Sequence, residues 1–509
     1  MDKPESVKLR EKFAPVFEEE GLSEVFNHLH LNNDEELEEK LSKLGDEKRE
    51  LAEDLIRQYR SEKSVSLQDV YEAYDRWMEF KDMKRVDVML AVALSNKATD
   101  LEPLWLIIIG PSGDGKTEQI RALRDPLEQT SPPEAYTKRI SEITQNTLVS
   151  GKKGKETDLA PRLEGKLILI YDFATILNLP TEAKRKVWAQ LRELYDGRIG
   201  KQAGSGKDVD YKLDPPPSLI ACSTPDIDNQ IIQQAKLGTR ELLYRTGTKT
   251  QEEVDKVLDK VLDNHNKMTE MREELKETTR KFLEETEADT EKTVTDKVKQ
   301  ILKVQAKRLA IMRAQGDFDR YTNGLMKNVS VEVPSRLVNQ LKTLYICLMS
   351  LSYDYSSDRA LEVIDKVVES SGEPRREKIL EELMNRKETT AYRLSKKLRV
   401  SRKMVERDLQ VLWNVGILDK EKKERDGNQS SITLWKVNEN HELVDVLQDG
   451  SLRSEIKEIV KEEDDGDGVK YETLFEKVGQ PEEETETVLE DMLESGEVFE
   501  PHAGHIKIL

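Results

Sequence analysis

The sequence has few cysteines, few aromatic residues and no long apolar run. Its two cysteines, Cys222 and Cys347, lie in apolar strings, which predicts buried free thiols rather than a disulfide or a metal site. The longest apolar runs, such as 104–109 and 167–171, are far too short to span a bilayer. No apolar signal segment opens the sequence. We therefore expect a cytoplasmic protein without a membrane partner.

Positive charge is also in deficit. The 509 residues carry a net charge of −20, with 36% charged and 36% hydrophobic residues. This composition indicates a well-solvated, helix-rich protein, and the length predicts several domains rather than one core. Because an acidic protein repels nucleic acid, any contact with DNA must come from local basic elements.

Hydrophobic periodicity divides the chain into helical and mixed segments. The first segment, about residues 1–82, is expected to contain short amphipathic helices, one of them over Val16–Phe26. Apolar runs bounded by glycine or proline then indicate buried parallel strands alternating with helices. A long charged helix is expected from about residue 250, with a bend at 284–291 and a second helix at Val294–Ala314. Its near-heptad spacing fits a helix packed on a neighbour or an autonomous coiled coil. The expected domains are 1–82, 83–248, 249–370, 371–440 and 451–509.

One segment matches the phosphate-loop pattern G-x-x-x-x-G-K-[ST], between an apolar strand and a helix. Its residues are Gly110, Pro111, Ser112, Gly113, Asp114, Gly115, Lys116 and Thr117. The glycines let backbone N–H groups curl around phosphate oxygens, and the helix N-terminus adds its positive dipole end. Lys116 would reach the β- and γ-phosphates, and Thr117 would ligate Mg²⁺. The sequence thus predicts ATP and Mg²⁺ as cofactors.

Two later strands end in candidate catalytic residues. Asp172 ends the strand at 167–171, which we expect to lie beside the phosphate loop, and would complete the Mg²⁺ shell; alternatively it caps the next helix. Ser223 could orient the attacking water, or be an ordinary turn residue. Phe173 stands where many such ATPases carry a second acid. Glu118 and Glu193 are the candidate replacements, and helix-surface roles are open for both.

Four strings resemble AAA+ ATPases of the MCM-like branch, especially those carried by phages and archaeal mobile elements. These strings are 103–118, 171–177, 191–197 and 237–245. The resemblance covers about residues 80–350. It implies an α/β AAA+ P-loop domain, flanked by a helical N-terminal domain, a helical lid and two C-terminal winged-helix domains. It also implies that Asp172-Phe173 is the branch's own variant of the Mg²⁺-strand motif.

The same resemblance implies roles for three arginines. Arg240 takes the position of the arginine finger, Arg245 is a second candidate, and Arg336 looks like the lid arginine that senses nucleotide. A surface ion pair is the alternative for a single arginine. An arginine acting on a neighbouring subunit requires an oligomer, and a hexameric ring is what the family implies.

Two basic segments of the ATPase region could contact DNA. A β-hairpin is expected between 195 and 219, with Arg198, Lys201 and Lys207 along or near its tip. In MCM-like rings such a hairpin lines the central channel; a solvated hairpin is the alternative. Lys152 and Lys153 lie in a second flexible loop, which could face the channel or simply be surface.

The segment at 371–440 resembles a winged-helix domain. Its helices are expected at Ala391–Leu398 and Ser401–Trp413, followed by a lysine-rich wing. The exposed face of the second helix would carry Arg402, Lys403 and Arg407. Winged helices lay this helix in the major groove, although some dock proteins instead.

The last segment also looks winged-helical. Its would-be recognition helix is rich in glutamate, and 481–500 contains no lysine or arginine. A protein partner is therefore expected there rather than DNA.

Two functions fit these features. The first is an ATP-dependent MCM-like DNA helicase or translocase in DNA replication, favoured by the hairpin before the third strand. The second is an ATP-switched DNA-binding initiator, helicase loader or transcriptional regulator, favoured by Phe173 and by the net acidity.

Overall fold

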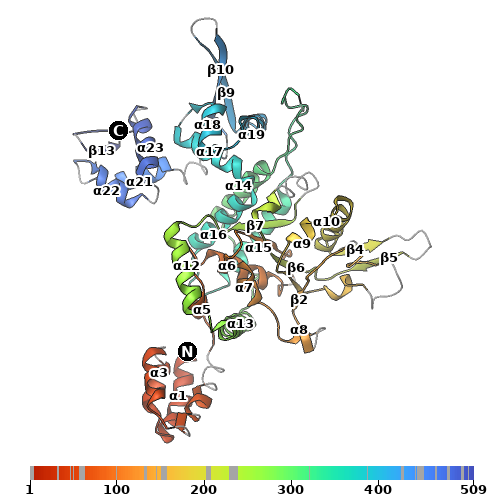
Figure 1. Cartoon of the computed structure of the whole chain (residues 1–509), viewed down its shortest axis with the longest axis vertical. Helices are drawn as coiled ribbons and strands as arrows, with labels where there is room; N and C mark the ends of the chain where they lie inside the picture. The colour runs from red at the N-terminus through yellow and green to blue at the C-terminus, as the bar shows by residue number, and fades with distance from the viewer. Residues whose placement is uncertain are drawn as a thin grey trace. The chain divides into compact units, whose positions relative to one another are not determined.

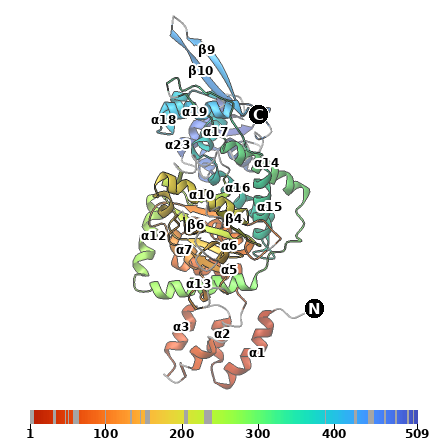
Figure 2. The same ribbon diagram turned by 90° about the vertical axis from the view of Figure 1, so that its right-hand side faces the viewer.

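The structure is a computed structural model of the whole chain (Figures 1 and 2). It describes residues 5–508 apart from a set of gaps. The gaps are 31–33, 46–47, 50, 57–63, 99, 131–133, 145, 151–157, 202–207, 229–238, 320, 387, 426–428, 442, 444–451, 465–466, 479–481, 495–497 and 503.

The chain forms two compact units. The helical unit comprises Met1–Met83, Arg121–Leu123 and Thr250–Glu287, and the sheet unit contains the rest. The expected lid of 249–370 is therefore divided, because its first part packs with the N-terminal helices.

The helical unit contains two groups of packed helices. Its helices are α1 Glu5–Glu19, α2 Ser23–His30, α3 Asp34–Ser42, α5 Leu67–Trp77, α12 Gln251–Asp263 and α13 Met268–Glu285. The N-terminal helices share a core around Phe17 and Phe26. In the second group, α13 buries Leu275 and Phe282 and contacts α5, where Trp77 Nε1 donates to Glu274 Oε2 at 2.7 Å.

Two expected helices in this unit are wrong in their extent. The helix predicted over Val16–Phe26 is broken at Gly21, whose φ of +70° is left-handed and ends α1. The long helix predicted from residue 250 is also broken, between Asp263 and Met268, at a segment with two asparagines, which are weak helix formers. None of the residues of α12 is buried, so the near-heptad spacing there does not mark a packed seam.

The sheet unit is built on a five-stranded parallel sheet in the order β2-β3-β6-β1-β7. The strands are β1 Trp105–Ile109, β2 Thr137–Arg139, β3 Leu167–Ile170, β6 Ser218–Ser223 and β7 Glu241–Arg245. The three central strands are buried along their whole length, which explains their continuous apolar sequences.

The predicted position of the Asp172 strand is wrong. β6 pairs with both β1 and β3, so it lies between the phosphate-loop strand and the strand that leads to Asp172. Chain order does not reveal this, because the long segment between β3 and β6 allows β6 to enter at either side.

Helices flank the sheet and connect it to the C-terminal segments. They are α6 Lys84–Ser95, α7 Lys116–Arg121, α8 Leu127–Thr130, α9 Ala174–Leu177, α10 Thr181–Tyr195, α14 Asp296–Met312, α15 Ser335–Met349 and α16 Ser357–Ser371, with 3₁₀ turns at Ala160–Arg162 and Pro225–Ile227. α15 packs on α6, and α16 packs on β7, where Ser371 Oγ accepts from Leu243 N at 2.7 Å. The antiparallel hairpin of β4 Arg198–Lys201 and β5 Val209–Lys212 is a separate two-stranded sheet close to α10 (Figure 1).

Two small modules complete the sheet unit. The first, called the helix–turn–helix (HTH) module below, is the segment expected to be a winged helix. It contains α17 Pro374–Arg386, β8 Glu388–Thr389, α18 Ala391–Lys397, α19 Arg402–Asn414, β9 Leu418–Arg425 and β10 Gln429–Val437. The C-terminal module contains α21 Leu452–Glu463, β11 Val469–Lys470, α22 Tyr471–Lys477, α23 Glu482–Glu494, β12 Val498–Phe499 and β13 His505–Ile508. Each module has a hydrophobic core and a three-stranded sheet, and the core of the HTH module also includes Met312 of α14.

Two expectations from composition can be compared directly with the structure. Cys222 and Cys347 are free and buried, as predicted. None of the helices in the described ranges combines the length and apolar composition that a membrane span needs.

The HTH module depends on its core, which a matched pair of substitutions on α19 can test. Leu409 is fully buried, whereas Met404 is 41% exposed. We expect Leu409→Ala to lower the free energy of opening of this module by about 2–5 kcal/mol. Met404→Ala should change it by less than about 0.5 kcal/mol. Hydrogen exchange of the β9 and β10 amides in the full chain measures both, and equal protection in the two variants would contradict this core.

Candidate functional site

The phosphate loop joins the end of β1 to the start of α7. Gly113 and Gly115 have φ angles of +83° and +75°, a left-handed conformation that glycine adopts without strain. A Cβ on Gly110 would lie 2.2 Å from Thr246 Oγ1 and 2.9 Å from Asp114 Oδ2. The turn therefore has no room for a side chain at Gly110, and its geometry fits a loop whose amides surround a phosphate.

Lys116, the first residue of α7, folds back over the loop. Its Nζ donates to the carbonyl oxygens of Gly110 at 2.8 Å and Pro111 at 2.5 Å. Burial lowers the pKa of this ammonium, while the neighbouring Asp114 acts to raise it. The ammonium is thus held by weak neutral acceptors that an anionic phosphate oxygen could replace.

Asp114 is the centre of a buried charge network that the sequence did not indicate. Its carboxylate lies 3.5 Å from Arg85 Nη1 and 3.5 Å from Lys249 Nζ. Arg85 also donates through Nε to Gln119 Oε1 at 2.9 Å, on α7. These basic residues are distant from the loop in sequence and belong to no motif, so only the fold could reveal them.

Asp172 and Ser223 follow or end strands at the same edge of the sheet as the phosphate loop. β3 and β6 are parallel to β1, so their carboxyl ends meet there. Asp172 is exposed, and its Oδ1 accepts from Ala174 N at 2.9 Å, which is the helix-capping interaction considered as its alternative role. Ser223 is buried and its hydroxyl donates to Thr224 O at 3.2 Å. The hydroxyl of Thr117 and the carboxylate of Asp172 are hard oxygen donors of the kind that suits Mg²⁺.

Phe173 occupies a position that does not suit a charged carboxylate. Its side chain is 2% exposed and belongs to the core of the sheet unit, with its ring 5.5 Å from that of Trp188 in an edge arrangement. Of the candidate replacements, Glu118 lies in the first turn of α7, beside Thr117. Glu193 instead faces β4, where its Oε2 accepts from Gly200 N at 3.5 Å. Glu118 is therefore the candidate that the fold keeps near the phosphate loop.

Arg240 and Arg336 lie near the opposite edge of the sheet. Arg240 immediately precedes β7, whose first residue pairs with the first residue of β1, so roughly 20 Å of strand separates it from the phosphate loop. Arg240 Nη2 donates to Asp196 Oδ2 at 2.9 Å. Gln340, one turn beyond Arg336 on α15, donates to Arg240 O at 2.6 Å and to Tyr195 OH at 2.9 Å.

Arg245 lies at the other end of β7, at the phosphate-loop edge. Its guanidinium makes a two-pronged ion pair with Asp228, at 3.0 Å and 2.6 Å, and also donates to Ser370 O at 3.0 Å. These bonds connect β7 to α16 within one chain. The second candidate finger is thus engaged in a structural role.

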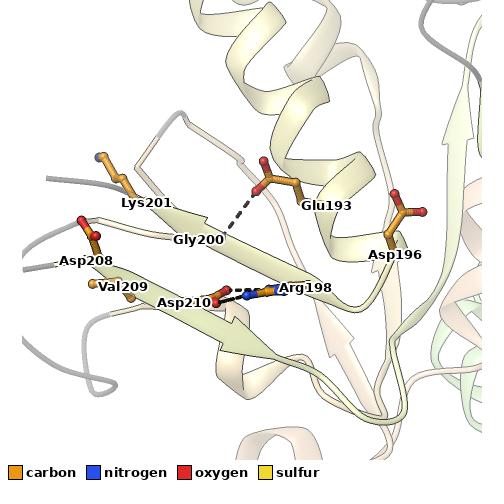
Figure 3. A pocket seen from close by; sticks show the side chains of 8 residues that line it. All are labelled: Glu193, Asp196, Arg198, Gly200, Lys201, Asp208, Val209 and Asp210. Carbon is orange, nitrogen blue, oxygen red and sulfur yellow. Dashed lines mark hydrogen bonds and ion pairs between the residues drawn. The ribbon is translucent and has the colours of Figure 1, made fainter.

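The β4–β5 hairpin borders a hollow of about 540 Å³ (Figure 3). Four acidic and two basic side chains line it: Glu193, Asp196, Asp208, Asp210, Arg198 and Lys201. Arg198 Nη2 is bonded to Asp210 Oδ2 at 2.6 Å, and Lys201 Nζ donates to Ser150 O at 3.2 Å. The described base of the hairpin is therefore acidic, which disfavours phosphate contact there. Lys207, Lys152 and Lys153 lie outside the described residues.

A buried aspartate ties this hairpin to the preceding loop. Asp158 accepts from Ser150 N at 2.8 Å, from Ser150 Oγ at 2.6 Å and from Tyr211 OH at 2.8 Å. Burial raises the pKa of Asp158, but these hydrogen bonds outweigh it and the net pKa is lowered. Ser150, Asp158 and strand β5 are thus fixed to one another.

The HTH module presents only part of its predicted basic face. Arg402 and Lys403 are exposed, and Ser401 caps α19 through a hydrogen bond from Met404 N at 3.3 Å. Arg407 departs from the prediction: it is half-buried, and its Nε donates to Asn323 Oδ1 at 2.6 Å. In the C-terminal module, Glu482, Glu486 and Glu490 of α23 are exposed.

Comparison with known proteins identifies one part of the chain by sequence. The HTH domain family matches residues 375–424, within the HTH module. No protein among the curated sequences matches this chain.

Solved structures give weaker likenesses. A full-length MCM homologue from Methanopyrus kandleri is 14% identical, with a TM-score of 0.31, over 56% of this chain and 55% of its own length. The chain thus spans about half the length of that homologue. The C-terminal region of NrS-1 is 14% identical, with a TM-score of 0.25, over 74% of this chain and 77% of that one. TM-scores this low carry no argument about what this chain does.

The burial of Phe173 gives a testable consequence. Phe173→Glu would place a carboxylate in an apolar cluster, so we expect a loss of roughly 3–5 kcal/mol of stability and no gain in hydrolysis. Phe173→Leu keeps the apolar contact and should cost about 1 kcal/mol. Thermal unfolding and steady-state ATP hydrolysis measure the two effects. A stable Phe173→Glu protein that hydrolyses ATP faster would show that this side chain can reach the site.

Proposed function

We propose that this chain is a Mg²⁺-dependent ATPase of the AAA+ type, MCM-like branch, that acts on DNA as a helicase or translocase in replication. The observation that carries the proposal is the phosphate loop itself. It follows a buried central strand, has two left-handed glycines and a close-packed Gly110, and begins a helix with Lys116. This arrangement fits the polyphosphate of ATP.

Each residue of the site has a role in this proposal. The loop amides and Lys116 bind and orient the phosphates, while Thr117 and Asp172 hold Mg²⁺, which neutralises charge that develops on the phosphates. Ser223, buried beside the loop strand, would orient the attacking water through its hydroxyl. Glu118 is the carboxylate available to accept a proton from that water.

Separation of the arginines from the loop supports an oligomer. Arg240 lies near the sheet edge opposite Lys116, too far to reach a nucleotide bound by its own chain, and α15 places Arg336 close to it. Both arginines would then act on the nucleotide of a neighbouring subunit, and a ring provides every site with such a neighbour. We propose a hexamer.

Contact with DNA is assigned to two elements. The HTH module supplies exposed Arg402 and Lys403 and the lysines of β9. The β4–β5 hairpin would reach the channel of the ring, with Lys201 at the end of its described strand and Lys207 beyond it. The acidic α23 of the C-terminal module is proposed to dock a protein partner, because its glutamates would repel phosphate.

A second candidate is an ATP-switched DNA-binding initiator, helicase loader or transcriptional regulator. Phe173 in the core and the acidic base of the hairpin favour it, because both point away from fast hydrolysis coupled to a DNA strand. Unwinding of forked DNA distinguishes the two. ATP-dependent duplex binding without unwinding would support the switch and exclude the motor.

Replacement of Lys116 tests the nucleotide site. Lys116→Ala removes a charged donor to the phosphates, so we expect affinity for a fluorescent ATP analogue to fall about 10- to 150-fold. Lys342→Ala, at an exposed position of α15, is the matched control and should leave affinity unchanged. If Lys116→Ala kept wild-type affinity and turnover, the assignment of this loop would be wrong.

Mixing two inactive variants tests action between subunits. Lys116→Ala disables the nucleotide site of its own chain, and Arg240→Ala would disable the site of its neighbour. In mixed oligomers, some interfaces combine an intact loop with an intact arginine, so we expect ATPase activity above that of either variant alone. Mixed oligomers that assemble but show no recovery would contradict a role for Arg240 in trans.

A further inference from the structure

A hairpin between the lid helices covers the recognition helix of the HTH module. Residues 315–319 and 321–330, here called the clasp, lie between α14 and α15 and close on themselves through bridges between Gln315 and Ser330 and between Phe318 and Leu325. At the turn, Asp319 Oδ1 accepts from Thr322 N at 2.6 Å and from Tyr321 N at 3.0 Å. The clasp is thus a folded element with its own hydrogen bonds.

The clasp is bonded to α19 mainly through Asn323. The side chain of Asn323 accepts from Arg407 Nε at 2.6 Å and donates to Lys403 O at 3.3 Å, while its carbonyl accepts from Gln410 Nε2 at 3.2 Å. Gln410 Oε1 accepts in turn from Leu325 N at 3.2 Å.

Further contacts extend along the same helix. Asn414 Oδ1 accepts from Val329 N at 2.8 Å, and the guanidinium of Arg407 lies 5.2 Å from the ring centre of Phe318. The contacts therefore run from the first turn of α19 to its last residue.

The covered face is the one that points away from the core of the module. The contacted positions 403, 407, 410 and 414 are spaced by four, three and four residues and so lie along one side of the helix. Val405, Leu409 and Leu412 are fully buried on the other side. In the docking mode of helix–turn–helix proteins, this outward side faces the bases of the major groove.

The side chains that the clasp uses are of the types that recognise bases. Arginine pairs with guanine, and asparagine or glutamine pairs with adenine, each through two hydrogen bonds. Here Arg407, Gln410 and Asn414 direct those groups to the clasp instead. While the clasp is in place, each of these three side chains is hydrogen-bonded to it, and Arg407 and Gln410 are only partly exposed.

The wing offers a basic surface that the clasp leaves accessible. Lys420 and Lys422 alternate along β9 and are exposed, and Lys420 Nζ lies 3.1 Å from the ring centre of Trp413. Figure 1 shows β9 and β10 as a ribbon that projects from the module. Weak, phosphate-directed binding through the wing therefore remains open.

We propose that the clasp is an intramolecular inhibitor of DNA reading: it occupies the outward face of α19, and its release converts weak wing binding into full groove binding. The proposal rests on the DNA binding proposed above for the HTH module. The clasp is positioned to respond to the nucleotide site, because it continues into α15, where Gln340 contacts Arg240.

The base of the clasp is firmly anchored, so release would concern its outer part. Arg313, just before the clasp, donates to Glu241 O at 2.8 Å, and Arg376 of the HTH module donates to Ala314 O at 2.5 Å. These bonds hold the module next to the lid. The contacts of Asn323, Leu325 and Val329 can then be lost without separating the two.

Asn323→Gly is the sharpest test. Asn323 has a φ of +57°, so glycine keeps the backbone conformation and removes only the side chain with its bonds to Arg407 and Lys403. Asn328→Gly is the matched control, because Asn328 is an exposed residue of the same clasp. Lys422→Ala reports independently on the wing.

The measurement is fluorescence anisotropy with a labelled mixed-sequence duplex, alongside hydrogen exchange of Leu325 and Val329. For Asn323→Gly we expect faster exchange of these amides and DNA binding on the order of tenfold tighter than wild type, from the loss of two hydrogen bonds. Asn328→Gly should match wild type in both. Lys422→Ala should weaken wild-type binding.

The other outcomes are equally decisive. In one of them, DNA binding by Asn323→Gly is unchanged or weaker while wild-type binding still depends on Lys422. This outcome would overturn the inhibitory role of the clasp and leave the DNA-binding role of the module intact. Absence of binding in every form, including an Asn323→Gly protein with faster exchange, overturns both. Unchanged exchange shows that Asn323 does not hold the clasp and also overturns the proposal.

Discussion

The direction of the strands in one parallel sheet is the constraint on which the proposed site depends. Because β1, β3 and β6 run the same way, the residues that follow them meet at one edge. The phosphate loop, Asp172 and Ser223 come together for that reason alone. The same polarity sends Arg240, which precedes its strand, to the far edge. Strand direction therefore brings the phosphate loop, Asp172 and Ser223 together and leaves Arg240 away from them.

The chain is acidic overall, and several of its arginines are bonded within the protein. Several arginines that could contact a ligand are bonded to side chains of the same chain: Arg245 to Asp228, Arg198 to Asp210 and Arg407 to Asn323. Because a guanidinium presents several donors in a fixed plane, each can join two elements at once. Arg402, Lys403, Lys420 and Lys422 of the HTH module and its wing are exposed.

The lid links these two regions. α15 carries Arg336 and Gln340 near its start, Gln340 contacts Arg240, and the clasp that precedes α15 in the chain is bonded to α19. A change in structure near Arg240 would thus be transmitted to α19 through α15 and the clasp. This path of hydrogen-bonded residues is the one along which the proposed nucleotide site and the proposed DNA-reading module would be coupled.

Features that depend on local pattern could be predicted from the residues alone. Continuous apolar runs predicted the buried strands, the loop pattern at Gly110–Thr117 predicted the strand–turn–helix, and Ser401 predicted the start of α19 to within one residue. Features that depend on contacts between distant residues were decided only by the tertiary structure. β6 entered between β1 and β3, Asp114 met Arg85 and Lys249, and the clasp covered Arg407, because strand order and side-chain partners follow from packing and leave no periodic trace in the chain.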